Sequence, residues 1–211
     1  MAFVTFEGID GSGKTTQAKR LVTVLGERSI TVVPAKEPDG GHIGLEIRAI
    51  LVKQRARKLD PYEEALLVSA ARYDHVRSVI RPALDAGSWV VCDRFIDSTF
   101  AFQVFENHVS ESFFDVVSSH VADQTHPDFT FILDLDAEVA LQRRSTGASL
   151  RHTDPAEAHR NFGRLRRGLL EVARRDPGRC HVIDATGSEE RVGAQILDVL
   201  QGSGRLHPSS A

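Results

Sequence analysis

Residues 8–15 read Gly-Ile-Asp-Gly-Ser-Gly-Lys-Thr. The octet fits the phosphate-binding pattern G-x-x-x-x-G-K-[ST], in which backbone N–H groups of a glycine-rich loop surround phosphate oxygens. In that pattern the lysine reaches the β- and γ-phosphates, and the following hydroxyl holds Mg²⁺. We therefore predict an ATP-binding loop that consists of Gly8, Ile9, Asp10, Gly11, Ser12, Gly13, Lys14, Thr15 and Thr16.

The segments on both sides of this loop have the expected character. Phe3–Phe6 is a short apolar run typical of a strand. After the loop, apolar residues recur at i, i+3, i+4 and i+7, which predicts a helix with one buried face. Further strands are predicted at Ile30–Val33, Trp89–Cys92, Phe129–Leu135 and His181–Ile183, with helices between them. This alternation predicts an α/β fold with a parallel sheet covered on both faces.

Two helical segments carry clear boundary signals. One begins at Asp60-Pro61-Tyr62-Glu63, where Asp60 and Glu63 form a capping box and Pro61 suits the first helical position. We predict that it reaches Ile80 and ends near Pro82. A second stretch spans about 155–175, and its stripe of Arg160, Arg164 and Arg167 is predicted to face solvent.

Composition narrows the class of protein. The chain has 211 residues, 41% hydrophobic and 26% charged residues and a net charge of −3. These values are typical of a single globular domain and indicate neither nucleic-acid binding nor membrane binding. Two cysteines predict no disulfide framework, and no signal-like or membrane-spanning run is evident, so we expect a cytoplasmic location.

Acids and arginines follow the predicted strands. Glu37 follows the second strand, and Asp93 with Arg94 follows the third, while Arg48 and Arg72 lie on nearby predicted helices. Ligands of open parallel sheets bind beyond the carboxyl ends of the strands. Planar guanidinium groups suit bidentate phosphate contacts. Asp93, directly after a predicted strand, is a candidate for an acidic residue beside Mg²⁺.

Taken together, these motifs resemble the thymidylate (dTMP) kinase family of P-loop nucleoside monophosphate kinases. The resemblance extends from Phe6 to about Leu197. It is carried by Phe6–Gln17, Glu37-Pro38, Ala70-Ala71-Arg72, Asp93-Arg94-Phe95, Ala101-Phe102-Gln103 and Val182–Thr186. It implies a three-layer P-loop fold with a five-stranded parallel sheet, a short lid and, often, a homodimer. The implied reaction transfers the γ-phosphoryl group of ATP to dTMP with Mg²⁺.

The resemblance also implies residue roles. Lys14 would bind ATP phosphates, and Thr15 and Asp93 would hold the metal. Asp10 would bind the acceptor sugar, Arg48 and Arg94 its phosphate, and Arg72 the pyrimidine. The remaining implied residues of the acceptor site are Glu37, Val68, Ser98, Thr99 and Phe102. The expected partners are therefore ATP and dTMP.

A lid is expected at about residues 143–154 of a single domain that spans 1–201, with a disordered tail at 202–211. One subgroup of the family has an arginine where this chain has Gly11, whereas the other supplies that charge from the lid. Arg143, Arg144 and Arg151 are the arginines of the predicted lid, and Arg143 and Arg151 are counted with Lys14, Asp93 and Arg94 as candidate catalytic residues.

The chain departs from the family at the base pocket. Val68 replaces the usual phenylalanine, which removes an aromatic face, and Phe102 replaces the usual tyrosine. Three hypotheses follow: a dTMP kinase, a kinase of another pyrimidine monophosphate, or a regulatory nucleotide-binding protein that has lost transfer. The intact acceptor residues Asp10, Arg48, Arg72, Asp93 and Arg94 argue against the third.

Overall fold

The computed structural model describes residues 1–53, 57–146 and 160–206, apart from the side chains of 144–146. Its centre is a sheet of five parallel strands in the order β2-β3-β1-β4-β5. The fold predicted from the sequence is therefore confirmed. The strands are β1 (Phe3–Glu7), β2 (Val32–Lys36), β3 (Trp89–Asp93), β4 (Phe129–Asp134) and β5 (Cys180–Asp184).

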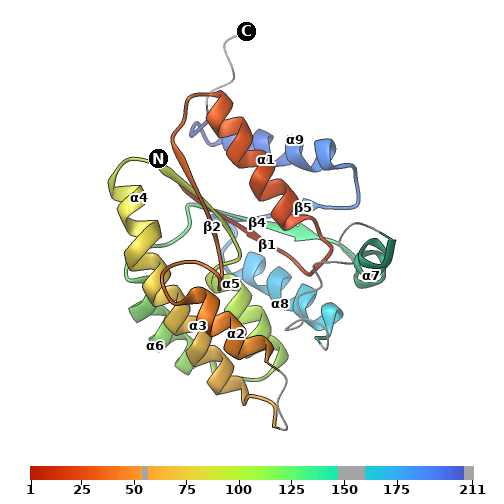
Figure 1. The fold of residues 1–211 in the computed structure, drawn as a ribbon. Coiled ribbons are helices and arrows are strands. Elements are labelled where there is room, and N and C mark those ends of the chain that lie inside the picture. The colour runs from red at the N-terminus through yellow and green to blue at the C-terminus, as the bar shows by residue number, and fades with distance from the viewer. Residues whose placement is uncertain (54–56, 147–159, 207–211) are drawn as a thin grey trace.

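Helices cover both faces of the sheet (Figure 1). On one face lie α1 (Lys14–Glu27) and α9 (Glu189–Gly202), which contact each other and the strands. On the other lie α4 (Arg81–Asp85) and α8 (Phe162–Arg175). The centre strands β1, β3 and β4 are buried almost throughout, because both of their faces pack against helices.

The remaining described helices pack against one another or against α4 and α8. They are α2 (Gly44–Val52), α3 (Pro61–His75), α5 (Ile96–Thr99), α6 (Glu111–Ala122) and α7 (Ala137–Thr146), with π-helical turns η1 (Val76–Ile80) and η2 (Phe100–Glu106). The parallel arrangement brings the ends of β1 and β3 together, since Phe6 is paired with Asp93. The phosphate loop therefore begins beside the acid that follows β3.

The predicted start of α3 is confirmed. Asp60 accepts a hydrogen bond from the Tyr62 amide at 2.8 Å, and the Asp60 amide donates to Glu63 at 2.7 Å. The predicted end near Pro82 is wrong. The helical path continues through η1 and α4 to Asp85, because Pro82 lies in the first turn of α4, where no amide donor is needed.

The C-terminal segment stays packed beyond residue 201. Leu206 is 1% exposed and belongs to the main apolar core, and its amide donates to the Leu200 carbonyl. Arg205 donates to the Met1 carbonyl at 3.0 Å. Residues 207–211 of the predicted tail lie outside the described residues. Within the described ranges, no helix is long and apolar enough to span a membrane.

Candidate active site

The phosphate loop joins β1 to α1. Gly11 and Gly13 have φ values of +90° and +93°, a region that glycine adopts without strain. A Cβ atom on Gly11 would lie 2.6 Å from the carbonyl oxygen of Ala140 in α7. Any side chain at position 11 would therefore require α7 to move away from the loop.

Asp93 and Thr15 meet at the end of β3. The Thr15 hydroxyl donates a short hydrogen bond to one carboxylate oxygen of Asp93. The other oxygen, Oδ1, is buried and has no hydrogen-bond partner among the described residues. A buried carboxylate oxygen without a donor is costly unless something else satisfies it. Hydroxyl and carboxylate oxygens are ligands that Mg²⁺ prefers, so this pair fits the predicted metal.

Asp10 joins the two cations of the loop region. Its Oδ1 lies 3.0 Å from Lys14 Nζ and 3.0 Å from a terminal nitrogen of Arg94. Arg94 also donates to the Gly8 carbonyl at 3.3 Å and to Ser98 Oγ at 3.1 Å. Its φ of +71° is unusual for a residue with a side chain and marks a strained turn of the kind found at functional sites. The predicted ATP side and acceptor side therefore meet at Asp10.

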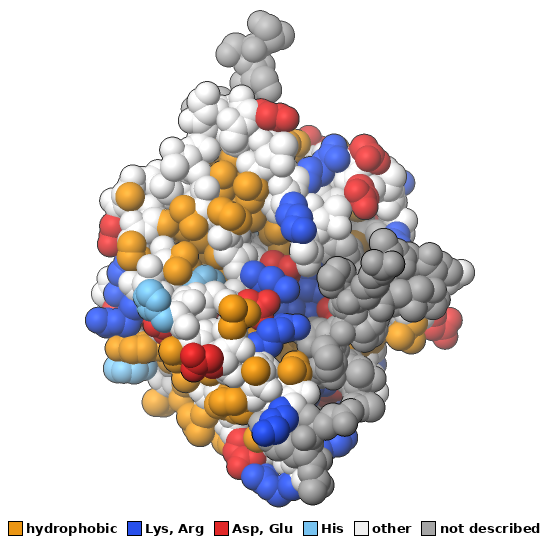
Figure 2. Space-filling view, viewed as in Figure 1, with side chains coloured by type: hydrophobic (Ala, Val, Ile, Leu, Met, Phe, Trp, Pro, Cys, Tyr) orange, Lys and Arg blue, Asp and Glu red, His pale blue; other side chains and the backbone are white. Residues whose placement is uncertain are grey.

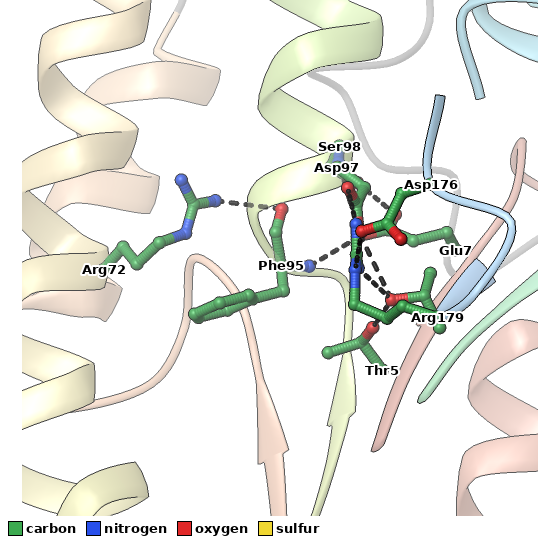
Figure 3. A network of polar contacts seen from close by, with 9 residues as sticks. Thr5, Glu7, Arg72, Phe95, Asp97, Ser98, Asp176 and Arg179 are labelled. Atoms are coloured by element: carbon green, nitrogen blue, oxygen red, sulfur yellow. Dashed lines mark hydrogen bonds and ion pairs between the residues drawn. The ribbon is translucent and has the colours of Figure 1, made fainter. Parts of the chain in front are cut away.

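A buried acid, Glu7, contacts Phe95 and Ser98, which follow Arg94 in the chain (Figure 3). Glu7, the last residue of β1, accepts hydrogen bonds from the Phe95 amide at 2.8 Å and from Ser98 Oγ at 2.6 Å. Burial, and then the charge of nearby Asp97, raise the pKa of Glu7 to about 7. Glu7 is absent from the predicted site, although it directly precedes the octet.

Asp97 is held from across the molecule. Arg179, in the turn before β5, donates to its carboxylate at 2.7 and 3.0 Å. Arg179 also contacts Thr130 Oγ1, which in turn lies 2.7 Å from Thr5 Oγ1. The network therefore links β1, β4 and the α8–β5 turn to Asp97 of α5, and Figure 3 shows Arg179 between Asp97 and Thr5.

Glu7 gives the stability of the fold a specific pH dependence. Because its pKa is raised, the folded protein keeps this proton at pH values where the unfolded chain has lost it. Its contribution therefore favours the folded state below about pH 4.5 and is lost as the pH rises toward about 7. We expect Glu7→Gln to remove this part of the pH slope in urea unfolding at several pH values. Exposed Glu27→Gln is the control, and equal slopes for wild type and Glu7→Gln would contradict the assignment.

A second buried cluster lies among the residues predicted to bind the acceptor. Arg72, 3% exposed, donates from Nε to Glu37 at 2.7 Å and from its terminal nitrogens to Thr99 Oγ1 and the Phe95 carbonyl, each at 3.0 Å. His75 Nδ1 lies 3.4 Å from the other oxygen of Glu37. Arg72 and His75 therefore fix the position of Glu37, which the sequence placed among the predicted acceptor residues.

The expectation that Arg160 faces solvent is wrong. Its side chain is only 16% exposed and donates to Glu64 at 2.6 Å. It also lies over the Phe102 ring, with 5.5 Å between Cζ and the ring centroid, and Arg94 lies 5.2 Å from the same ring. The helical periodicity of α8 gave no sign of this position, because Arg160 precedes the helix.

Most of the predicted site residues line one large cleft of about 1170 Å³. In Figure 2, Lys and Arg side chains gather near the centre of the face, where the strand ends meet the surrounding helices of Figure 1. Among the predicted site residues of the described ranges, Gly8 and Ile9, at the start of the loop, do not line the cleft. Those that do are Asp10, Gly11, Ser12, Gly13, Lys14, Thr15, Thr16, Glu37, Arg48, Val68, Arg72, Asp93, Arg94, Ser98, Thr99, Phe102 and Arg143.

Two predicted arginines lie at the edges of this arrangement. Arg48 pairs with Asp39 at 3.1 Å and is a quarter exposed. Arg143, on α7, donates to the carbonyls of Ala185 and Thr186 at 2.9 and 3.1 Å. The side chain of Arg144 and all of Arg151 lie outside the described residues, so both remain predictions.

Comparison with known proteins decides the family. The family model described as thymidylate kinase matches residues 6–196. The chain belongs to the thymidylate kinase family. A thymidylate kinase of Caulobacter vibrioides is 43% identical over 199 residues, which cover 94% of this chain and 95% of that protein. One of Symbiobacterium thermophilum is 38% identical and covers 94% and 92%.

A solved structure agrees with this assignment. The crystal structure of thymidylate kinase from Ehrlichia chaffeensis superimposes with a TM-score of 0.73 at 36% identity. The match covers 95% of this chain and 98% of that one. As a thymidylate kinase family member, the chain is a nucleoside monophosphate kinase, and therefore a phosphotransferase, built on the P-loop fold.

Proposed function

We propose that this protein transfers the γ-phosphoryl group of ATP to dTMP, yielding ADP and dTDP, in a Mg²⁺-dependent reaction in the cytoplasm. The observation that carries the proposal is the single cleft that holds both a phosphate loop with Lys14 and a separate cluster around Arg72 and Arg94. A protein that only bound ATP would need the first set of residues and not the second. The curated relatives are named thymidylate kinases, which supports dTMP as the acceptor.

On the donor side, we assign the loop amides and Lys14 to the ATP phosphates. Thr15 and Asp93 would hold Mg²⁺, and the unpartnered Asp93 Oδ1 supports this role. The metal would supply positive charge beside the transferring phosphoryl group. Arg143 lies beside the loop after β5 and is a candidate for a contact with ATP.

On the acceptor side, we assign Arg94 and Arg48 to the dTMP phosphate and Asp10 to the sugar hydroxyl. Arg72 and Thr99 would meet the pyrimidine edge. The acceptor oxygen is already anionic, so the reaction needs no strong general base. Catalysis therefore reduces to holding two repelling phosphates in line and neutralising charge on the equatorial oxygens, which clustered Lys and Arg side chains do.

The test is an acceptor panel. Mg²⁺-dependent release of ADP from ATP is measured with dTMP, dUMP, dCMP, UMP and CMP. We expect the highest kcat/KM with dTMP. A clear preference for another pyrimidine would favour the second hypothesis, which Val68 and Phe102 support. If no acceptor stimulates turnover, the protein is a nucleotide-binding protein without transfer.

Val68 provides a more specific prediction. It lines the cleft on α3 with Arg72 one turn further along the helix, so the two side chains share a face. We expect Val68→Phe to lower the KM for dTMP several-fold, because an aromatic ring adds a stacking surface worth about 1 kcal/mol. Initial rates at fixed ATP measure this effect. An unchanged KM would show that position 68 does not face the base.

We also propose that the protein is a homodimer. Large apolar side chains are exposed on the packed helices α2, α3 and α6, among them Leu45, Leu66 and Val116. Figure 2 shows apolar side chains over the region where α3 and α6 lie in Figure 1. Sedimentation equilibrium would give twice the mass of the 23.2 kDa chain, and a concentration-independent monomer mass would refute the proposal.

A further inference from the structure

Arg160 lies where three elements meet at the acceptor end of the cleft. Its guanidinium donates to Glu64 of α3 at 2.6 Å and lies 3.6 Å from Glu106 at the end of η2. It also covers the ring of Phe102, which belongs to η2. Arg160 itself directly precedes the Asn161 cap of α8, and the Asn161 amide donates to Glu106 at 2.7 Å.

The partners of Arg160 are part of the acceptor pocket. Glu64 and Val68 are separated by one turn of α3 and share a face, and both line the cleft together with Phe102 and Arg160. The Phe102 ring is also within 5.2 Å of the Arg94 guanidinium. One ring therefore separates the arginine assigned to the acceptor phosphate from Arg160.

Besides contacting Phe102, Arg160 neutralises two acidic side chains. Glu64 and Glu106 place two carboxylates beside a pocket that must receive an anionic nucleotide. Both acids are mostly buried, with side chains 21% and 8% exposed, so their charges are weakly screened. These carboxylates would repel the nucleotide phosphate. The Arg160 guanidinium offsets this repulsion because it pairs with both acids, and its flat face packs against the Phe102 ring.

We propose that Arg160 is a positioning residue of the acceptor pocket, which holds Phe102 and Glu64 as one wall for a pyrimidine monophosphate. The inference rests on the proposed function. The fixed side chains of Phe102 and Glu64 would form a wall of the same cleft in which Val68 presents only a small aliphatic side chain. Since Arg160 acts through Phe102 and Glu64, we expect its replacement to weaken the binding of dTMP more than that of ATP.

The experiment compares Arg160→Met with Arg164→Met. Arg164 lies in the first turn of α8, four residues after Arg160, and contacts His108 rather than Phe102, which makes it a matched control. We expect Arg160→Met to raise the KM for dTMP about tenfold and to leave the KM for ATP within twofold, with Arg164→Met close to wild type. Arg160→Lys should recover part of the lost affinity for dTMP. Its ammonium restores the positive charge but lacks the flat face that packs against Phe102.

A double-mutant cycle with Glu64→Gln tests whether the pair acts as a unit. If it does, the double variant has nearly the same KM for dTMP as the worse single variant. Purely additive effects, equal losses for ATP and dTMP, or an unchanged KM in Arg160→Met would overturn the proposal. Should Arg160→Met fail to fold, Arg160→Lys and Glu64→Gln carry the same comparison.

Calorimetry of dTMP binding without ATP separates this proposal from the proposed function. A wild type that binds dTMP and does not transfer phosphate refutes the kinase proposal, and the Kd ratio between wild type and Arg160→Met still tests Arg160. A kinase that is active on dTMP and keeps its Kd in Arg160→Met refutes the role of Arg160 alone.

Discussion

Lys14→Met is expected to lower kcat about 10³-fold with dTMP and ATP at saturation. The Lys14 side chain is 7% exposed, and its ammonium is fixed by Asp10 and the Ile9 carbonyl, so it is preorganised at the phosphate loop. Charge that spreads over the transferring phosphoryl group would lose its nearest protein cation. A methionine retains the aliphatic stem, and Arg94 remains to neutralise Asp10.

Steady-state kinetics and thermal unfolding of the same preparations check this prediction. Lys58→Met is the control, since Lys58 is exposed and does not line the cleft. A melting temperature near that of wild type would show that the loss of rate is chemical and not structural. A kcat within fivefold of wild type would remove Lys14 from the catalytic assignment.

Arg72→Met is expected to lower the free energy of unfolding by about 3–5 kcal/mol, because it leaves the buried carboxylate of Glu37 without its guanidinium. Both side chains are about 5% exposed or less, so water cannot replace the lost partner. The same change removes the donors to Thr99 and the Phe95 carbonyl. We therefore also expect a large increase in the KM for dTMP.

Urea unfolding of three variants isolates the pair. Arg72→Met combined with Glu37→Gln should unfold at higher urea concentration than Arg72→Met alone, because no unpaired charge remains. Arg57→Met is the control: Arg57 makes a similar two-point contact with Glu63 at the surface, where an ion pair contributes little. If Arg72→Met is as stable as Arg57→Met, the burial of the Arg72–Glu37 pair does not increase its contribution to the free energy of unfolding.

The phosphate loop, the family and all five strands were accessible from the sequence, although the second strand, predicted at Ile30–Val33, spans Val32–Lys36. Each depends on local signals: glycines required by loop geometry, apolar runs bounded by turns, and a capping box at Asp60. Local signals were weaker where the backbone deviates from regular helix. The π-helical turn before Pro82 lets the helical path continue through a residue that ordinarily predicts its end. The Ser110 cap of α6 was a usable signal that the sequence prediction overlooked.

The parallel pattern of strands also predicted which edge of the sheet would carry the site. It therefore identified the acids and arginines that follow β2 and β3 as candidates, and these residues do line one cleft. What this pattern cannot specify is the partner of each charge. Glu37, for example, pairs with Arg72 and His75 of α3, and Arg48 pairs with Asp39.

By itself, the sequence determined the fold, the phosphate loop and the kinase family, because these follow from short-range patterns that tolerate few alternatives. Only the tertiary structure decided how the charges pair. Asp97 meets Arg179 across 82 positions, and Glu64 meets Arg160 across 96. Such pairs form when buried polar groups must find partners among whichever elements the sheet brings together. The prediction that Arg160 faces solvent was therefore wrong, because this side chain packs into the cleft beside Glu64.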